Sequence, residues 1–477
     1  MSTLWTGAEL AEALGVPAPD IAVTGVSIDT RTLQAGDLFI ALKDQRDGHD
    51  FVAVAIKSGA AAALVSRAVD GVDADKLILV PDVLAALNQL ARFARARSAA
   101  RVIAVTGSVG KTGTKDMLRH MLAAQGQVHA AEKSYNNHWG VPLTLARLPR
   151  EADFAVIEIG MNHPGEIAPL SQLARPHVAM ITTVAAVHAE AFSGVEAIAD
   201  EKAAIFEGLE AQGVAVLPRD NAHYERLKRA TSATVVTFGE HDASTFHMTR
   251  AHVSPTATVV EASSPDGPFV FKLGAPGLHL AMNALGALAA AHAAGADLAR
   301  AALALAQWRA PEGRGAQYSI AFGPSGLDGH LTLIDESYNA NPASMGAALT
   351  LLALSPVENG IGRVANGRRI AVLGDMLELG RHELALHAGL ATHSALTKIH
   401  KVHCIGVRMK ALHAALPFEK RGQWFADSSE CATQIGRMLD AGDVVMAKGS
   451  FGSRLAVVVD AIKNLGECSP LNTGEGE

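Results

Sequence analysis

The sequence predicts an α/β protein with three domains, and two observations support this prediction. The chain has 477 residues, enough for about three domains of ordinary size. Short β-branched runs alternate with Ala- and Leu-rich segments at helical spacing, which is typical of parallel sheets covered by helices. We expect the domains to span residues 1–98, 99–312 and 313–477.

Hydrophobic periodicity places the main segments of each domain. In the first, a small α/β unit, helices are expected at Ala8–Leu14, Phe51–Ser58 and Ala85–Ala96. In the central domain, strands are expected at Val102–Thr106, Phe154–Ile159, Val178–Val184 and Val214–Leu217. In the third, Rossmann-like domain, strands are expected at Leu331–Asp335, Arg369–Leu373, Val402–Ile405 and Val444–Ala447. Loops are expected at Gly323–Gly329 and Val357–Gly367, and a frayed tail after Glu467.

Composition and charge exclude several classes of protein. Hydrophobic residues make up 49% of the chain and charged residues 19%, as in a folded chain rather than a disordered one. No apolar run reaches the roughly 18 residues of a membrane span, and the N-terminus lacks the pattern of a signal peptide. The net charge of −7 argues against nucleic-acid binding. The three cysteines are widely spaced, so we expect neither a disulfide nor a zinc site, and a reducing cytoplasm is the simplest location. We also expect the protein to be a monomer.

A glycine-rich loop lies between the expected strand Val102–Thr106 and a helix expected over Thr112–Gln125. Backbone N–H groups of such a loop can turn toward phosphate oxygens, and the helix N-terminus adds partial positive charge. Lys111 would reach the β- and γ-phosphates of ATP, and the Thr112 hydroxyl would bind Mg²⁺. The alternative is an ordinary glycine-rich turn. The candidate phosphate-binding residues are Gly107, Ser108, Val109, Gly110, Lys111, Thr112 and Gly113.

Two further residues lie where strands are expected to end. Glu158 ends an expected parallel strand, and the carboxyl ends of such strands border the crevice where ligands bind. One carboxylate near the phosphates is enough for Mg²⁺, which prefers oxygen ligands. His188 follows another strand and could face the same phosphates, although its spacing alone favours a structural histidine. Lys202, by composition alone, is a solvated helix lysine.

Three residues are candidates for the other side of the nucleotide. Asn283 opens an Ala-rich helix and could pair with the adenine edge, with a polar helix start as the alternative. Arg314 lies at the junction of the second and third domains, where it could contact the phosphates of ATP. Asp335 ends an expected strand and could bind the ribose hydroxyls.

The spacing of the glycine-rich loop departs from the usual phosphate loop and resembles that of the Mur ligase family. Three further segments resemble the branch of that family that adds D-alanyl-D-alanine: Ser134–Pro142, Asp335–Ser344 (with one extra residue) and Val372–Gly380. In the first domain, Ser27–Arg31, Gly36–Phe39 and Asp47–His49 resemble the family's uridine-nucleotide domain. Phe451, after Lys448–Ser450, departs from the family pattern.

The resemblance implies a uridine-nucleotide domain, an ATP-binding domain and a C-terminal ligase domain, acting in peptidoglycan synthesis. It implies ATP and Mg²⁺ as cofactors, UDP-N-acetylmuramoyl-tripeptide and D-alanyl-D-alanine as substrates, and an acyl phosphate between them. It also implies that Lys202 is carbamoylated. The implied catalytic residues are Lys111, Glu158, His188 and Lys202, and the implied metal ligands are Thr112, Glu158, His188 and Lys202. The implied substrate-binding residues are Ser27, Asp29, Arg31, Asp47, His49, Asn136, Asn137, Tyr338, Asn339, Asn341, Lys448 and Ser450.

Other functions stay open at this point. Within the same class, the alternatives are another Mur-type ligase or a folylpolyglutamate-type ligase. From a different class, the alternatives are a regulatory or transport ATPase with a phosphate loop, and a catalytically dead binding module, against which the intact Lys111 and Thr112 argue. Such an ATPase would turn over ATP without a peptide product, and it would not need Glu158, His188 and Lys202 together. The third residue of the accepted peptide, meso-diaminopimelate or lysine, also stays open.

Overall fold

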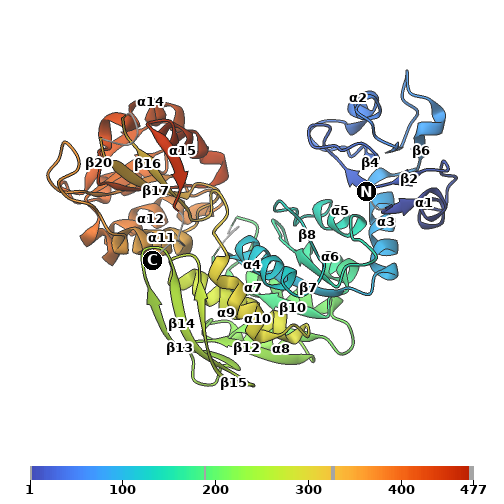
Figure 1. Ribbon diagram of the computed structural model, residues 1–477, viewed down its shortest axis with the longest axis horizontal. Coiled ribbons are helices and arrows are strands. Elements are labelled where there is room, and N and C mark those ends of the chain that lie inside the picture. The colour runs from blue at the N-terminus through green and yellow to red at the C-terminus, as the bar shows by residue number, and fades with distance from the viewer. Residues whose placement is uncertain (1–2, 187–189, 324–327, 472–477) are drawn as a thin grey trace.

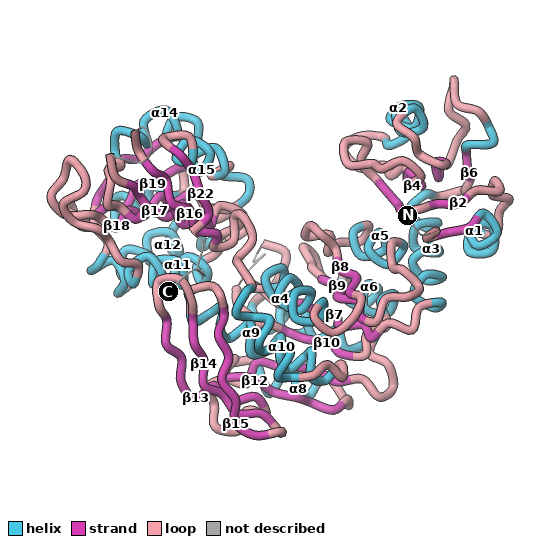
Figure 2. Tube along the Cα trace, in the orientation of Figure 1, coloured by secondary structure: helices cyan, strands magenta, loops and turns pink. Residues whose placement is uncertain are grey.

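The computed structural model describes residues 3–186, 190–323 and 328–471, which form three lobes (Figure 1). In this view the central lobe lies lowest, with the N-terminal and C-terminal lobes above it on opposite sides. Figure 2 shows helices flanking strands in each lobe. The predicted α/β class is confirmed, whereas the domain boundaries near residues 98 and 312 stay predictions.

The N-terminal lobe is built on a small parallel sheet. Its strands are β1 (Trp5–Thr6), β2 (Ala22–Val23), β3 (Gly25–Ser27), β4 (Asp37–Ile40), β5 (Ala62–Val65) and β6 (Leu77–Leu79). Strands β3, β4, β5 and β6 pair in that order and in parallel, and β1 pairs with β2 separately. Its helices are α1 (Gly7–Leu14), α2 (Val52–Lys57) and α3 (Val83–Arg97). They lie where helices were predicted, and Thr6 and Glu9 form a capping box at the start of α1.

The central lobe contains a nine-stranded sheet. Its strands are β7 (Arg101–Thr106), β8 (Val128–Ala130), β9 (Phe154–Glu158), β10 (Val178–Ile181), β11 (Val214–Pro218), β12 (Thr234–Gly239), β13 (Phe246–Val253), β14 (Thr258–Ser264) and β15 (Gly267–Leu273). The sheet order is β15-β14-β13-β12-β11-β10-β7-β9-β8, and β8 to β13 are parallel. Strands β13, β14 and β15, which pair antiparallel with one another, were not predicted, because they lack the continuous apolar runs by which the other strands were found.

Helices cover both faces of this sheet. They are α4 (Lys111–Ala123), α5 (Gly140–Ala146), α6 (Ile167–Ala174), α7 (Val195–Ala203), α8 (Tyr224–Arg229), α9 (Leu278–Ala293) and α10 (Leu298–Ala304). Helices α4 and α9 share one hydrophobic core with the sheet, and α6 and α7 share the other. Because β7 lies inside the sheet, between β10 and β9, the loop that follows it opens at the carboxyl edge of the parallel strands.

The C-terminal lobe contains a seven-stranded sheet of order β20-β19-β18-β21-β17-β16-β22. Its strands are β16 (Ala316–Ala321), β17 (His330–Glu336), β18 (Arg369–Gly374), β19 (Lys401–Ile405), β20 (Arg421–Phe425), β21 (Val444–Lys448) and β22 (Glu467–Pro470). Its helices are α11 (Pro342–Leu354), α12 (Glu383–Gly389), α13 (Met409–Ala415), α14 (Ser428–Met438) and α15 (Ala456–Lys463). Residues 357–367 lie in a loop as expected, whereas residues 324–327 of the other expected loop lie outside the described residues.

The predicted frayed tail after Glu467 is wrong for its first residues. Residues Glu467–Pro470 form β22, which pairs antiparallel with β16 and places Cys468 opposite Ile320. The four residues of β22 are all exposed, so no hydrophobic pattern marked them. Their order comes from main-chain hydrogen bonding to the open edge of β16, which local sequence does not reveal.

The N-terminal and central lobes pack closely through α5. Trp5 Nε1 donates a hydrogen bond to Ala146 O at 2.9 Å, and Arg147 Nε donates one to Val26 O at 2.6 Å. Leu143 and Ala146 belong to the same hydrophobic core as the N-terminal strands. In the part of the chain that the structure describes, no helix is long and apolar enough to cross a membrane.

A pair of matched substitutions tests the packing of the central lobe. Phe238 is fully buried, and its ring lies against Gly286 of α9. We expect Phe238→Ala to lower the free energy of unfolding by about 3–5 kcal/mol, because it leaves a cavity between α9 and the sheet. Phe418 is 85% exposed, so Phe418→Ala should change it by no more than about 0.5 kcal/mol. Urea unfolding followed by circular dichroism measures the stability of both variants. Equal transition midpoints for Phe238→Ala and Phe418→Ala would contradict the packing of Phe238 against α9.

Candidate active site

A glycine-rich loop, residues 107–110, joins β7 to α4 and forms the base of the candidate site. Gly107 (φ 149°) and Gly110 (φ 86°) adopt backbone conformations that favour glycine. A Cβ atom on Gly107 would collide with the Thr182 hydroxyl, and one on Gly110 would lie 2.6 Å from Asn283 Nδ2. No side chain among the described residues caps the N-terminus of α4, so its first N–H groups are available to an anion.

The loop is held by the segment that follows β10. Thr182 Oγ1 donates to Val109 O at 2.6 Å, and Ser108 N donates to Thr183 O at 2.8 Å. The Ser108 hydroxyl donates to Ala185 O at 2.9 Å. Sequence analysis missed Thr182 and Thr183, although two threonines at the end of a central parallel strand were an available signal.

Lys111 is the first residue of α4, and its ammonium group turns back over the loop. Lys111 Nζ donates to Gly107 O at 2.7 Å. Burial lowers the pKa of Lys111, the charge of Arg314 lowers it further, and Glu158 opposes the shift. The side chain of Lys111 is thus positioned beside the backbone N–H groups of the loop, where it could reach a bound phosphate.

Glu158, at the end of β9, gathers three donors on one carboxylate oxygen. Its Oε1 accepts from Thr112 Oγ1 at 3.0 Å, from Ser134 Oγ at 2.8 Å and from Asn136 Nδ2 at 2.8 Å. The side chain is 2% exposed. Its other oxygen, Oε2, is buried and has no hydrogen-bond partner among the described residues.

This arrangement fits a magnesium ion. A buried carboxylate oxygen without a partner is costly, and a cation beside it would remove that cost. Mg²⁺ needs only one or two carboxylates because substrate phosphates and waters complete its coordination. The described residues contain no group of three or more His, Cys, Asp or Glu that could hold a metal alone. His188, the other predicted ligand of this kind, lies outside the described residues.

Lys202, on α7, lies behind Met161 rather than in solvent. Its side chain is among the largest fully buried ones, and Nζ approaches Met161 Sδ at 3.9 Å. Burial lowers the pKa of Lys202 well below its usual value, and the charge of Lys111 adds to this effect. The solvated helix lysine that composition alone favours is therefore wrong, whereas a role as metal ligand stays a prediction.

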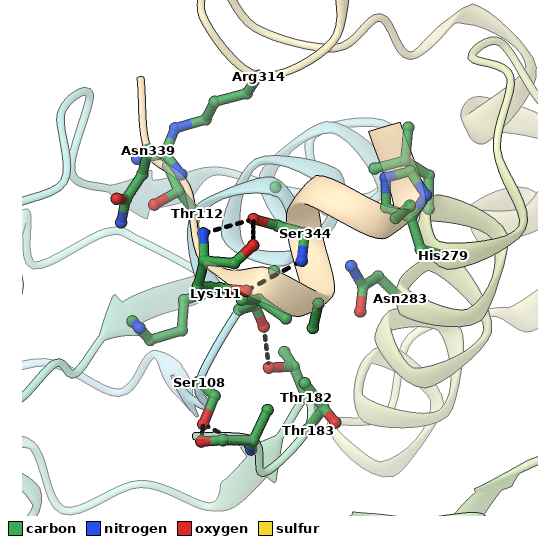
Figure 3. A pocket seen from close by; sticks show the side chains of 18 of the residues that line it. Ser108, Lys111, Thr112, Thr182, Thr183, His279, Asn283, Arg314, Asn339 and Ser344 are labelled. Carbon is green, nitrogen blue, oxygen red and sulfur yellow. Dashed lines mark hydrogen bonds between the residues drawn. The ribbon is translucent and has the colours of Figure 1, made fainter. Parts of the chain in front are cut away.

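A cavity of about 710 Å³ opens above the loop, between the central and C-terminal lobes. In the view of Figure 3, His279 and Asn283 of α9 lie on one side of it, and Arg314 and Asn339 on the other. Burial lowers the pKa of His279. Of the predicted site residues, the cavity is lined by Ser108, Val109, Gly110, Lys111, Thr112, Gly113, Asn136, Asn137, Glu158, Asn283, Arg314, Tyr338, Asn339, Asn341 and Lys448.

The C-terminal lobe contributes ordered polar groups to this cavity. The Arg314 guanidinium lies 3.9 Å from the centroid of the Tyr338 ring. Lys448, only 2% exposed, donates to Glu336 Oε2 at 3.0 Å and to Asn339 O at 2.9 Å. These contacts fix the two cationic side chains before any ligand binds.

Some predicted residues have local structural partners. Asn341 caps α11, where its side chain accepts from Ser344 N at 2.9 Å. Asp335 does not line the cavity, because its carboxylate accepts from Gly313 N at 3.0 Å and from Ser337 Oγ at 2.6 Å. Ser450 also lies outside the lining and donates to Ala340 O at 3.2 Å. Their roles in binding ligands stay predictions.

The predicted uridine-site residues gather in the N-terminal lobe, away from the cavity lining. Ser27 Oγ donates to Asp29 O at 3.1 Å, and the Asp29 carboxylate accepts from Arg31 N at 3.0 Å and from the Arg31 guanidinium at 2.6 Å. That guanidinium lowers the pKa of Asp29 to about 2. His49 Nδ1 donates to Asp47 at 2.6 Å, and His49 Nε2 accepts from Ser66 N at 2.9 Å.

Three family models match successive parts of the chain. The Mur ligase family catalytic domain matches residues 22–95, the Mur ligase middle domain matches 105–291, and the Mur ligase glutamate ligase domain matches 325–451. The chain is 37% identical to the UDP-N-acetylmuramoyl-tripeptide–D-alanyl-D-alanine ligase of Escherichia coli K12, over 94% of this chain and 96% of that one. The chain belongs to the Mur ligase family.

Further relatives of this Mur ligase agree in length and fold. The enzyme of the same name from Bacillus subtilis is 35% identical, with 92% of each chain covered. A crystal structure of MurF from Acinetobacter baumannii superposes with a TM-score of 0.81 at 29% identity, covering 96% of this chain and 99% of that one. The MurF ligase of Thermotoga maritima, solved with ADP, has a TM-score of 0.74 at 24% identity over 92% and 97% of the two chains, which supports the fold alone.

The unpaired oxygen of Glu158 leads to a test of the magnesium site. We expect Glu158→Gln to keep the hydrogen bonds on one oxygen but to remove the charge that would face the ion. We measure the factor by which Mg²⁺ increases the affinity for ADP. Because the ligand charge is lost, this factor should be at least ~10-fold smaller in Glu158→Gln than in the unchanged protein. Calorimetric titration of ADP with and without Mg²⁺ measures this. Equal magnesium dependence in both proteins would place the metal elsewhere.

Proposed function

We propose that this protein joins D-alanyl-D-alanine to UDP-N-acetylmuramoyl-tripeptide with conversion of ATP to ADP and phosphate, in peptidoglycan synthesis. The curated relatives reported above carry this activity in their names and match nearly the whole chain. One observation carries the proposal: the same cavity is lined by the phosphate loop and Glu158 from the central lobe and by Arg314, Tyr338 and Lys448 from the C-terminal lobe. A regulatory ATPase would turn over ATP without forming a peptide product.

The central lobe would supply the phosphoryl-transfer half of the site. The N-terminus of α4 and Lys111 would hold the β- and γ-phosphates, while Thr112 and Glu158 would hold Mg²⁺. Bound Mg²⁺ would neutralise phosphate charge. Asn283 lies beside Gly110 and lines the cavity, and its amide would pair with the adenine edge. Because phosphoryl transfer depends mainly on positioning and charge, these groups suffice without a protein nucleophile.

The reaction would proceed in two steps. A carboxylate oxygen of the tripeptide attacks the γ-phosphorus, the bond to the bridging oxygen breaks, and ADP leaves. The amine of D-alanyl-D-alanine then attacks the acyl carbon, loses a proton, and phosphate leaves as the amide forms. Arg314 would contact the phosphates of ATP, and its charge and that of Lys448, which both line the cavity, would stabilise the developing oxyanion.

The proposal includes a carbamate on Lys202, formed from the neutral amine and CO₂ with release of one proton. Burial and the charge of Lys111 both favour the neutral amine, which supports this step. The neighbouring acids are engaged elsewhere: Asp200 pairs with Arg226 at 2.9 Å, and Glu201 accepts from Gly165 N at 2.7 Å. The charge of Glu201 still raises the pKa of Lys202 and so opposes the effect of burial.

The proposal also includes the cytoplasm as the place of action and a monomer as the working state. The free cysteines Cys404, Cys431 and Cys468 agree with a reducing compartment.

The ligation reaction can be tested by measuring phosphate release. We expect phosphate from ATP only when both UDP-N-acetylmuramoyl-tripeptide and D-alanyl-D-alanine are present, together with the peptide product by mass spectrometry. Lys111→Ala should lower the rate at least ~10-fold, since it removes a cation from the transferring phosphoryl group. Full phosphate release without either substrate would favour the regulatory ATPase and refute the ligase.

Acetate rescue tests the carbamate on Lys202. We expect Lys202→Ala to be nearly inactive and to recover partly with added acetate, because a small carboxylate can enter the cavity left beside the metal. Labelling with ¹³C-bicarbonate should give a carbamate NMR signal in the unchanged protein and none in the variant. Lys228, exposed on α8, provides the matched control, and Lys228→Ala should keep full activity. A fully active Lys202→Ala would end the carbamate proposal.

A further inference from the structure

A second lysine of α4, Lys115, lies one helical turn beyond Thr112 and is almost completely buried. Its side chain is 2% exposed. Lys115 Nζ donates to Ala131 O at 2.6 Å and to Lys133 O at 3.2 Å. Lys115 does not line the cavity, so it does not reach a ligand there. A buried ammonium group that binds only main-chain oxygens costs stability, which calls for an explanation from its neighbours.

The two acceptors of Lys115 begin a segment, residues 131–136, that leads into the site. Two residues of this segment, Ser134 and Asn136, donate to Glu158 Oε1 at 2.8 Å each. The far end of the segment is fixed as well, since Gly160 N donates to Asn136 O at 2.8 Å. The amide of Asn136 approaches Gly160 closely, since its Cγ atom lies 2.8 Å from where a Cβ atom on Gly160 would be. Lys115 and Gly160 therefore hold the segment on either side of the donors to Glu158.

We propose that Lys115 is a positioning residue for the magnesium–nucleotide site. By fixing residues 131–136 against α4, it places Ser134 and Asn136 so that both bind one oxygen of Glu158. The other oxygen, Oε2, is thereby left without a partner and directed to the metal. Thr112, on the same helix, is the third donor to Oε1, so α4 sets the orientation of Glu158 both directly and through Lys115. This inference rests on the proposed binding of Mg²⁺ with the nucleotide.

Lysine suits this position because its ammonium group has three donors and no acceptor. Methionine has a similar length and shape but cannot donate, so Lys115→Met would leave two carbonyl oxygens without their partner. Glutamine can donate to one carbonyl and offers a conservative replacement. Arg119, one turn further along α4, has a side chain that is 51% exposed and pairs with Asp116, so Arg119→Met is the matched control.

The experiment measures ADP binding by calorimetry, with and without Mg²⁺, in the full-length protein. We expect Lys115→Met to weaken ADP binding in the presence of Mg²⁺ by about 10–100-fold, as for other residues that orient metal ligands. Without Mg²⁺, ADP binding should change less than about threefold, because the phosphate loop itself is intact. Lys115→Gln should recover part of the magnesium effect, and Arg119→Met should bind as the unchanged protein does.

A double variant separates positioning from general loss of structure. If Lys115 acts through Asn136, Lys115→Met combined with Asn136→Ala should weaken Mg²⁺–ADP binding no more than the stronger single variant. Additive losses, equal losses with and without Mg²⁺, or unchanged magnesium dependence would each overturn the proposal. Failure of both Lys115 variants to fold, judged by circular dichroism, would assign the side chain to stability and overturn it too. These binding results do not depend on ligation, so an inactive but Mg²⁺–ADP-binding protein would refute only the proposed function.

Discussion

Glu158 accepts hydrogen bonds from three side chains on one oxygen and leaves the other buried without a partner. This asymmetry ties together segments that lie far apart in the sequence: Thr112 from α4, and Ser134 and Asn136 from the segment after β8. These donors leave Glu158 Oε1 fully engaged, so the carboxylate is oriented before a ligand arrives. Such preorganisation removes the cost of arranging the charge during reaction.

On the opposite wall of the cavity, the C-terminal lobe also holds charged side chains in place before a ligand binds. Lys448 ends a fully buried strand and is held by Glu336 and the main chain of Asn339, while Arg314 rests on the ring of Tyr338. Both cations are fixed by contacts within their own lobe. The cavity is thus made of two preformed walls, and the approach of one lobe to the other would exclude water without rebuilding either wall.

Local features of the site were predictable from sequence, whereas features made by distant contacts were not. The loop after β7 was found because strand, glycines, lysine and helix are contiguous. The motif resemblance also led to Asn136 and Lys448, which line the cavity. Lys115 was missed because its acceptors lie 16 and 18 residues away, and Ser134 because its carboxylate lies 24 residues away. The strand formed by Glu467–Pro470 was missed because only its pairing with β16 orders it.

The hydrophobic core shared by the first two lobes affects the distance between the N-terminal lobe and the phosphate loop. Leu143 and Ala146 of α5 pack among the N-terminal strands, and Trp5 and Arg147 add hydrogen bonds across the junction. The C-terminal lobe, by contrast, is joined through a short chain segment in which Arg309 bonds to Gly274 O while Gly313 bonds to Asp335. None of these contacts between the first two lobes involves the third lobe, so a movement of the third lobe would leave them in place. For a ligand that binds both the N-terminal lobe and the phosphate loop, the distance between its two ends would then stay the same.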